Sequence, residues 1–277
     1  MTPGTADVRP PAVSPEARLW CVVAAGVLTV LALVPPLSGL AHRYETAEAL
    51  RFSVFAIVVP ALVVLGAPWW RLGLAARPGS PADGGAPTGP VDRLARGRRR
   101  HPELIRAFGF VALDVAVMTL WRTPVGVDNV VRHGWLVVPE LVTLVAAGVG
   151  LWLECIESPP LVPRSTRPLR AAIAAVAMWS VWIMAYLVAL SRSNWYATFH
   201  HVAGHGLSAP ADQQFATVVL WFVAAAAFVP VVFWNLTRWL RTEEDPDDEL
   251  HRLVKEERRR GWASPPARLG PKPGSVG

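Results

Sequence analysis

The sequence predicts an all-α fold, a polytopic bundle of about six transmembrane helices. Of its 277 residues, 52% are hydrophobic and only 17% are charged, and the mean hydropathy is +0.33. The apolar residues fall in continuous blocks of about 18 to 25 residues, long enough to cross a hydrocarbon core of about 30 Å as helices. Because the Val, Leu and Ala in these blocks do not alternate with polar residues, the blocks fit helices rather than the strands of a barrel.

The six predicted spans follow one another with tryptophans at most of their ends. Trp accounts for 13 of the aromatic residues, more than Tyr and Phe together, and its amphipathic ring prefers the headgroup layer. The tryptophans therefore support the span boundaries independently of hydropathy. The predicted spans are approximately 18–37, 49–70, 104–121, 135–155, 169–191 and 215–240.

The basic residues predict the orientation of the bundle. Of the 27 Lys and Arg residues, 22 fall in segments on one side of the predicted spans, and five fall on the other side. By the positive-inside rule, both termini are cytoplasmic in a bacterial-type cell membrane, and the loops at about 38–48, 122–134 and 192–214 face outward. The first span has no credible cleavage site and is expected to stay as a signal anchor.

Three regions flank or interrupt this transmembrane domain, which covers residues 18–241. Residues 1–17 are rich in proline and are expected to be a disordered cytoplasmic N-terminus. Residues 72–102 combine Gly, Pro and Arg, which predicts a flexible cytoplasmic linker whose arginines either rest on anionic headgroups or only set the topology. Residues 242–277 form a charged, mostly disordered tail, in which a short helix can start at Asp247.

The outward stretch "WYATFHHVAGHGLSAPADQQFA" (195–216) holds the candidate metal ligands His200, His201 and His205. His201 and His205 are four residues apart and would share one face of a helical turn, and histidines on an oxidising surface suit Zn(II) or Cu(II). Solvated histidines or histidines packed at an interface explain the same spacing, so both interpretations stay open. No histidine falls within a span, so we expect no haem, because haem needs axial ligands from the helices.

The same stretch is long for a bundle loop and is predicted to be an outward lid over the mouth of the bundle. Asp212 or Ser208 can cap the sixth span. Gln213 and Gln214, at the membrane edge, are expected to reach toward the neighbouring loop, which contains Trp121, Pro124 and Asp128.

Asp114 stands in the middle of an apolar span and is a functional candidate, since an ionisable group at that depth is costly. It is either a hydrogen-bonded structural acid, with Ser180 or Tyr186 as partner, or part of a proton relay. No nucleophile elbow, phosphate loop or zincin motif occurs in the sequence, so we expect no enzyme.

Three stretches, in order, resemble the CtaG-type cytochrome c oxidase assembly factors over about residues 41–244. "VVPALVVLGAPWW" (58–70) is similar to the end of that family's second span, and "LWRTPVGVDNVVRHGW" (120–135) is similar to its Trp-His-x-Pro loop. "ADQQFATVVLW" (211–221) and "TRWLRTEE" (237–244) resemble the start and exit of its last span.

The resemblance implies an assembly factor for a haem–copper oxidase, linked to copper supply or insertion at the outer face. It implies oxidase subunits and membrane lipid as partners, with no nucleic acid. The positions that match the family are Trp121, Pro124, Asp128, Glu140, Asp212, Gln213 and Gln214.

The chain departs from the family at the histidines that the resemblance implies. The His-x3-His pair of the second span falls on Glu48 and Phe52, that of the fourth span on Val137 and Leu141, and the histidine of Trp-His-x-Pro on Arg122. Two alternatives therefore stay open: a transporter of small solutes or ions, and a non-catalytic membrane scaffold that has lost the metal site.

Overall fold

The computed structural model describes residues 14–75, 89–98, 102–163, 165–191, 193–201 and 208–263, with the backbone alone at 200–201 and 242–263. Within these residues the regular structure is helical throughout. Six helices are long and apolar enough to cross a membrane, so the predicted all-α polytopic bundle is confirmed. These candidate spans are Pro15–Leu33, Glu45–Gly66, Glu103–Arg122, Gly134–Cys155, Arg167–Leu190 and Ala209–Arg241.

The first two spans pack against each other. The first is α1 (Pro15–Leu33), which the Ser14 hydroxyl caps by accepting from the Ala17 N–H at 3.1 Å. The short α2 (Leu37–Ala41) leads to the second span, which is built from α3 (Glu45–Ser53), the π-helical turn η1 (Val54–Val58) and α4 (Val59–Gly66).

The π-helical turn lies just before Pro60, which has no N–H to donate to the carbonyl of Ala56. Gly148 of the fourth span packs at this carbonyl, where an added Cβ would lie 2.8 Å from the oxygen. The absence of a side chain at Gly148 therefore lets the second and fourth spans approach closely.

The third to fifth spans are continuous α-helices. They are α6 (Glu103–Arg122), α8 (Val137–Cys155), which follows the single turn η3 (Gly134–Leu136), and α9 (Arg167–Leu190). The short α7 (Pro124–Arg132) connects α6 to η3, and η4 (Ala197–His201) follows α9.

The sixth span is the first part of α10 (Ala209–Ala263), which runs on well beyond the apolar segment. The structure thus differs from the mostly disordered tail expected from residue 242, because the charged stretch up to Ala263 continues the same helix.

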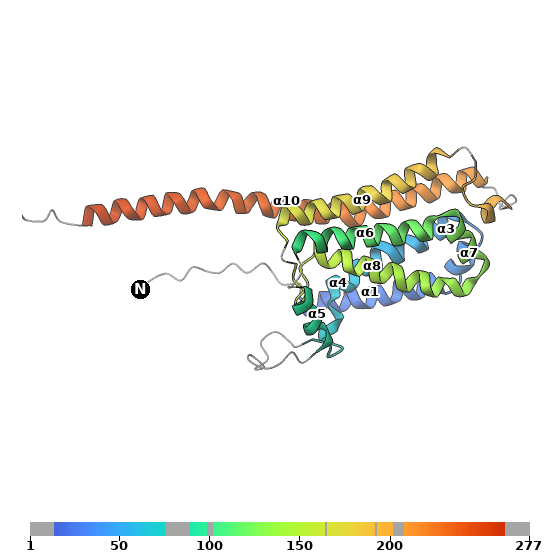
Figure 1. The fold of residues 1–277 in the computed structure, drawn as a ribbon, viewed down its shortest axis with the longest axis horizontal. Coiled ribbons are helices and arrows are strands. Elements are labelled where there is room, and N and C mark those ends of the chain that lie inside the picture. The colour runs from blue at the N-terminus through green and yellow to red at the C-terminus, as the bar shows by residue number, and fades with distance from the viewer. Residues whose placement is uncertain are drawn as a thin grey trace, which may run out of the picture.

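Figure 1 shows the arrangement: α9 and α10 lie side by side, and α6, α8, α4 and α1 complete the bundle. The start of α3 and α7 lie at one end, which we call the α7 end. The other end carries α5 (Pro90–Arg98) and the extension of α10, and we call it the α5 end. Large buried side chains fill the centre, with Trp152 of α8 stacked on Phe228 of α10 at 4.7 Å between ring centroids.

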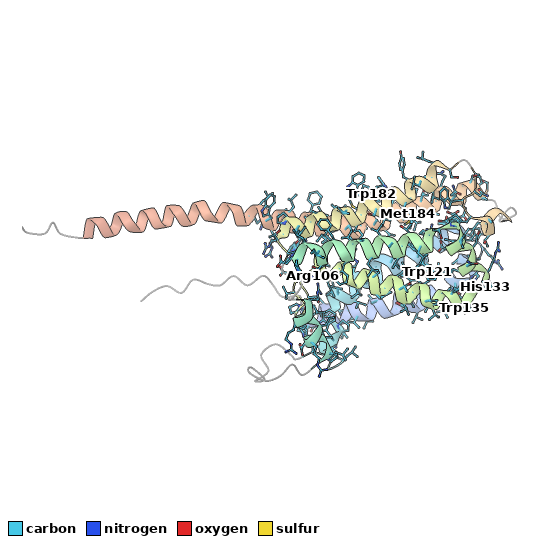
Figure 2. All side chains as sticks on the ribbon, viewed as in Figure 1. Arg106, Trp121, His133, Trp135, Trp182 and Met184 are labelled. Carbon is cyan, nitrogen blue, oxygen red and sulfur yellow. The ribbon has the colours of Figure 1, made fainter. Side chains whose placement is uncertain are left out.

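The outer surface of the bundle is apolar, as a lipid-facing surface must be. Figure 2 shows side chains projecting outward along the bundle. Ile105 is 72% exposed and Phe222 is 70% exposed, which in water would be unfavourable but in lipid is the expected environment.

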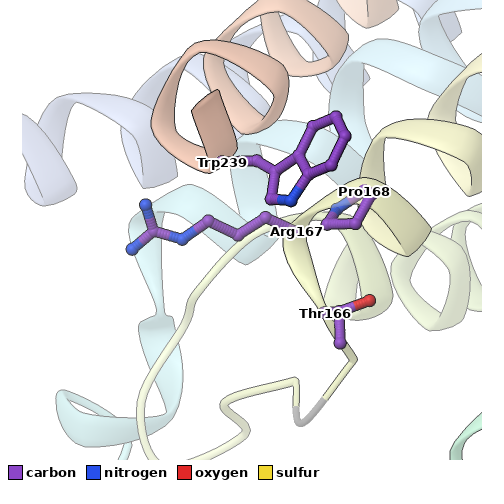
Figure 3. A pocket seen from close by; sticks show the side chains of 4 residues that line it. All are labelled: Thr166, Arg167, Pro168 and Trp239. Carbon is purple, nitrogen blue, oxygen red and sulfur yellow. The ribbon is translucent and has the colours of Figure 1, made fainter. Parts of the chain in front are cut away.

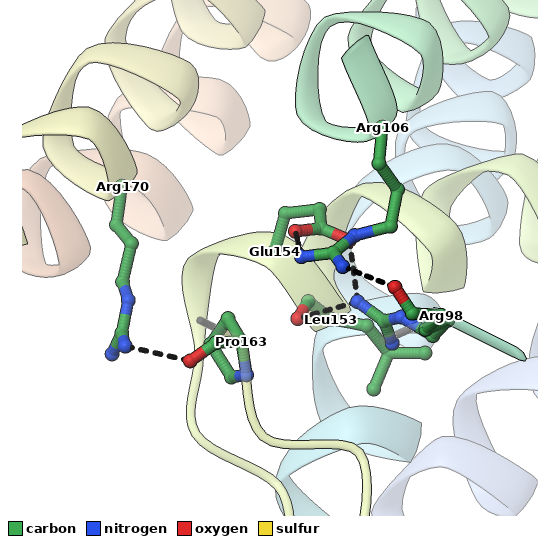
Figure 4. A network of polar contacts seen from close by, with 6 residues as sticks. All are labelled: Arg98, Arg106, Leu153, Glu154, Pro163 and Arg170. Atoms are coloured by element: carbon green, nitrogen blue, oxygen red, sulfur yellow. Dashed lines mark hydrogen bonds and ion pairs between the residues drawn. The ribbon is translucent and has the colours of Figure 1, made fainter. Parts of the chain in front are cut away.

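An ion-paired network fixes α5 to the bundle (Figure 4). The fully buried carboxylate of Glu154 on α8 accepts from Arg106 at 2.8 and 3.0 Å and also from Arg98 of α5. Burial lowers the pKa of the Arg98 guanidinium, and the charge of Glu154 opposes this effect. The expectation of a flexible linker is therefore wrong for residues 90–98. The ion pair between Arg98 and the buried Glu154 holds this helix against the bundle.

Candidate functional site

Two ion pairs lie buried among three spans at the α7 end. Glu48 of α3 accepts a hydrogen bond from Nη1 of Arg122 at the end of α6, and Arg51 Nη2 lies 3.4 Å from Oε2 of Glu140 on α8. None of these four side chains belongs to a residue more than 3% exposed. Glu48 and Arg51 are three residues apart and share one face of α3, so α3 contributes one charge to each pair.

The Arg122 guanidinium is enclosed by aromatic rings as well as by Glu48. Its central carbon lies 5.2 Å from the ring centroid of Phe52 and 5.3 Å from that of Tyr196. Such stacking favours a planar, weakly hydrated guanidinium at a buried position. Arg122 therefore joins α3, α6 and the segment between α9 and α10.

We call Glu48, Arg51, Arg122 and Glu140 the ion-pair cluster. Some buried polar atoms of this cluster and of the nearby Glu45 have no hydrogen-bond partner among the described residues. These are Nε and Nη2 of Arg122, Nε of Arg51 and Oε1 of Glu45. Unpaired donors and acceptors at buried positions are costly, so a packed bundle rarely keeps them without a role. The cluster is thus the strongest candidate for a functional site in the described residues.

Tyr196 covers the cluster from the segment after α9. Its hydroxyl donates to the carbonyl of Arg122 at 3.1 Å, and its side chain is fully buried with Phe199 and Val127. Burial raises the pKa of the Tyr196 phenol, so the hydroxyl stays protonated and keeps this hydrogen bond. No sequence motif marks Tyr196 as a member of this site.

Asp128 of α7 ties the same segment down. Its carboxylate accepts from the backbone N–H of Thr198 at 3.0 Å and from the Thr198 hydroxyl at 2.6 Å. Residues 195–201, the described part of the predicted lid that precedes α10, are therefore packed on α7 and over the Arg122 guanidinium.

Asp212 is a helix cap, but for a different helix from the one expected. Its carboxylate accepts from the N–H groups of Glu45 and Thr46 at 2.6 and 3.1 Å, and from the Thr46 hydroxyl at 2.6 Å. Asp212 thus caps the start of α3, while Ser208 makes the local contact with the Ala211 N–H at 3.4 Å. The prediction that Asp212 caps the sixth span is wrong because the neighbouring helix presents better-placed donors.

Gln213 and Gln214 hold the end of α9. Gln213 accepts from the Trp195 N–H at 2.9 Å and donates to the Val188 carbonyl at 2.8 Å, and Gln214 donates to the Ala189 carbonyl at 3.1 Å. They satisfy carbonyls that a helix end leaves unpaired. The expectation that they reach toward Trp121, Pro124 and Asp128 is wrong.

Trp121 and Pro124 have structural positions at the same end. The Trp121 indole donates to the Thr143 hydroxyl at 2.9 Å, which links α6 to α8. Pro124 begins α7, where its missing N–H costs nothing, and Thr123 caps that helix.

Asp114 is separate from the cluster, eight residues before Arg122 on α6, or about 12 Å along the helix. It is 2% exposed, and its Oδ1 has no hydrogen-bond partner among the described residues. Neither expected partner reaches it: the Ser180 hydroxyl donates to Val176 in its own helix, and Tyr186 is 64% exposed.

The expected metal ligands lie mostly outside the described residues. His205 lies beyond them, and only the backbone of His200 and His201 is described, in η4. In the described residues, no three His, Cys, Asp or Glu side chains are grouped so that they could hold a metal ion. The candidate metal site thus stays a prediction.

The ion-pair cluster does not fit copper. Its donors are carboxylate oxygens, whereas copper prefers imidazole, thiolate or thioether ligands. Two guanidiniums, of Arg51 and Arg122, already neutralise Glu140 and Glu48 and would repel a cation. Of the positions where the resemblance implies histidines, Glu48 and Arg122 therefore form an ion pair with each other instead, and the Phe52 ring lies against the Arg122 guanidinium.

The fold and this site define a multi-pass membrane protein whose polar centre is an interhelical ion-pair cluster at one end of the bundle. The family model described as cytochrome c oxidase caa3 assembly factor (Caa3_CtaG) matches residues 4–242. The chain therefore belongs to this family, and the family resemblance found in the sequence is confirmed. No curated protein and no solved structure matches the chain.

Proposed function

We propose that this protein assists the maturation of a haem–copper cytochrome c oxidase in the bacterial-type cell membrane. Its partners are oxidase subunits, and it performs no catalysis of its own. Membership of the assembly-factor family supports the role, and the six candidate spans support the membrane location.

In this proposal, the α7 end faces outward and both termini are cytoplasmic. The partition of Lys and Arg supports this orientation, because 22 of the 27 fall in the termini and in the sequence segments that follow the second and fourth predicted spans, with the flanks of these segments. The two exceptions within the cluster, Arg51 and Arg122, are paired with Glu140 and Glu48. Their charges are therefore already compensated inside the bundle.

The ion-pair cluster is the observation that carries the proposed mode of action. It ties α3, α6 and α8 together directly beneath α7 and η4, so these two short helices form a firmly held outer surface. Such a surface suits a scaffold that docks an oxidase subunit. Val125 on α7 is 70% exposed there, and Trp135 of η3 is 71% exposed.

The resemblance implies a role in copper supply. In this proposal, His200, His201 and His205 bind the copper, and the ion-pair cluster does not. The oxygen and guanidinium groups of the cluster are a poor match for copper, whereas three closely spaced imidazoles are a suitable set for Cu(II). These histidines follow directly on the segment that Asp128 and Tyr196 hold in place.

A pull-down of tagged protein tests the docking role. Wild-type protein should co-purify with oxidase subunits, and cells that lack the protein should lose oxidase activity. Val125→Asp should reduce the capture of oxidase subunits, whereas Val162→Asp, at a 49% exposed position near the α5 end, should not. If cells without the protein keep full oxidase activity and no subunit co-purifies, the proposal fails.

A further inference from the structure

A cavity of about 530 Å³ opens at the α5 end, away from the ion-pair cluster. It lies between the start of α1 and α9, the ends of α4 and α8, and the part of α10 that leaves the bundle. Its size falls in the range of about 300 to 1,000 Å³ that is typical of small-molecule sites. It is lined by Arg18, Leu65, Cys155, Ile156, Glu157, Pro159, Arg167, Arg170, Pro230, Val231, Trp234, Asn235 and Arg238.

The packing of α10 explains why the cavity is there. Along the second span, α10 packs mainly against α3 and η1, so the two spans are in close contact toward the α7 end. The main contacts of α4 are instead with α1 and α8, so α10 and α4 separate toward the α5 end. At this end Asn235 of α10 contacts α8 instead, by donating to the Cys155 carbonyl at 3.4 Å.

The lining combines a strongly basic rim with an apolar wall. Four arginines from three helices meet one acid, Glu157. Arg170 is held in place by Glu157 at 2.6 Å and by the carbonyls of Ser165 and Pro163 at 2.8 and 2.9 Å. Among the residues that line the cavity, the arginines therefore outnumber the single carboxylate, which Arg170 engages.

Aromatic rings hold two of the other arginines at the edge of the cavity. The guanidinium of Arg18 lies 4.6 Å from the ring centroid of Trp70, and that of Arg238 lies 4.7 Å from that of Trp234. A guanidinium stacked on a ring keeps its N–H donors in the plane of the group, where an oxyanion can accept from them.

Arg167, at the start of α9, extends the basic rim. It also lines a neighbouring hollow of about 380 Å³ with Thr166, Pro168 and Trp239 (Figure 3). The Trp239 indole lies beside Pro168, and the Arg167 guanidinium extends away from it.

The depth of the cavity corresponds to the headgroup layer. The spans Pro15–Leu33 and Arg167–Leu190 begin there, and the span Glu45–Gly66 ends there. Trp70 and Trp239 are in the position of interfacial anchors. Trp234 is 60% exposed on the outside of α10, so the apolar wall is continuous with the lipid-facing surface.

We propose that this cavity binds an anionic phospholipid of the surrounding membrane. The phosphate accepts from the arginines of the rim, and the upper part of an acyl chain runs along Trp234, Val231 and Leu65. A basic pocket between transmembrane helices next to an apolar surface is the arrangement that recognises such lipids. The inference does not depend on the oxidase role, since it rests only on the lining and depth of the cavity.

Lipid titration of the purified protein tests this inference. Phosphatidylglycerol should raise the unfolding temperature of the delipidated protein in detergent, whereas phosphatidylcholine and inorganic phosphate should not. The variant Arg167→Gln with Arg238→Gln should bind phosphatidylglycerol roughly tenfold more weakly, because two charge-assisted contacts are lost. The matched control, Arg43→Gln with Arg132→Gln, removes two exposed arginines at the α7 end and should bind like the wild type.

Three outcomes would overturn the inference. Equal stabilisation by phosphatidylcholine would show that charge is not recognised, and equal stabilisation by inorganic phosphate would show a free-anion site. Equal weakening in the control variant would show a non-specific effect of net charge. If the arginine variant does not fold, Val231→Trp, which fills the cavity without changing its charge, should abolish the stabilisation instead.

Discussion

Arg122 of α6 and Glu48 of α3 form an ion pair at a position where each residue is at most 3% exposed. Taking both charges out of water is costly, and their attraction offsets this cost only while both are present. The pair therefore makes the α7 end sensitive to the loss of either partner.

Glu48→Ala should lower the free energy of unfolding by roughly 3 to 5 kcal/mol, because it leaves the Arg122 guanidinium buried without its counter-charge. The double variant Glu48→Met with Arg122→Met should recover most of this loss, since apolar side chains of similar volume can replace a buried pair. Thermal or denaturant unfolding in detergent measures both effects. A Glu48→Ala protein as stable as the exposed control Arg132→Gln would contradict the burial of this pair.

Asp212→Ala should destabilise the protein by roughly 0.5 to 2 kcal/mol through loss of the cap on α3. Because Asp212 accepts from the Thr46 hydroxyl at 2.6 Å, Thr46→Val should cost less in the Asp212→Ala background than in the wild type. A double-mutant cycle on the free energy of unfolding tests this coupling. Strictly additive costs would show that Asp212 does not act on α3.

The spans were predictable from the sequence because their length and apolar composition depend only on local residues. The structure begins the sixth span at Ala209 rather than near residue 215, since its first turn carries the polar Asp212, Gln213 and Gln214 that hydropathy excludes. The family resemblance also marked Glu140 and Asp212 as candidate site residues, because both match the family's motifs. It drew attention to Glu48 as well, which stands where the resemblance implies a histidine.

The partners of these residues could not be predicted in the same way. In a span that is apolar on all sides, periodicity does not fix which face meets which neighbour. Arg51 and Tyr196 were therefore not predicted as members of the site. An arginine three residues after Glu48 in an apolar segment is nevertheless itself a signal of a buried ion pair. A local capping rule could not assign Asp212 either. Its carboxylate accepts from the N–H groups at the start of α3, which belongs to another span.

Single-cysteine labelling tests the proposed orientation in a background that lacks Cys21 and Cys155. Ser208→Cys should react with an impermeant maleimide in intact cells, whereas Gly85→Cys should react only after permeabilisation. Reaction of Gly85→Cys in intact cells would reverse the topology.

Asp114→Asn should leave the protein folded and oxidase maturation intact. The amide keeps a polar group at this buried position and removes only ionisation, and Oδ1 of Asp114 has no hydrogen-bond partner among the described residues. Oxidase activity in cells that carry the variant, at equal protein level, measures this. Loss of activity without loss of protein would instead assign Asp114 to a proton relay.

Copper binding distinguishes the ion-pair cluster from the predicted histidine site. Purified protein equilibrated with Cu(II) should lose bound copper when His200, His201 and His205 are replaced by Ala, because imidazole is the preferred ligand type available at the outward end. Glu48→Gln with Glu140→Gln should leave the copper stoichiometry unchanged, since both carboxylates are engaged by arginines. Atomic absorption on dialysed samples measures the stoichiometry, and circular dichroism confirms the helical fold of each variant. If the carboxylate variant loses copper and the histidine variant keeps it, the cluster is the metal site after all. If neither variant changes the stoichiometry, copper binds elsewhere in the protein. If the wild type binds no copper, the predicted metal site is wrong.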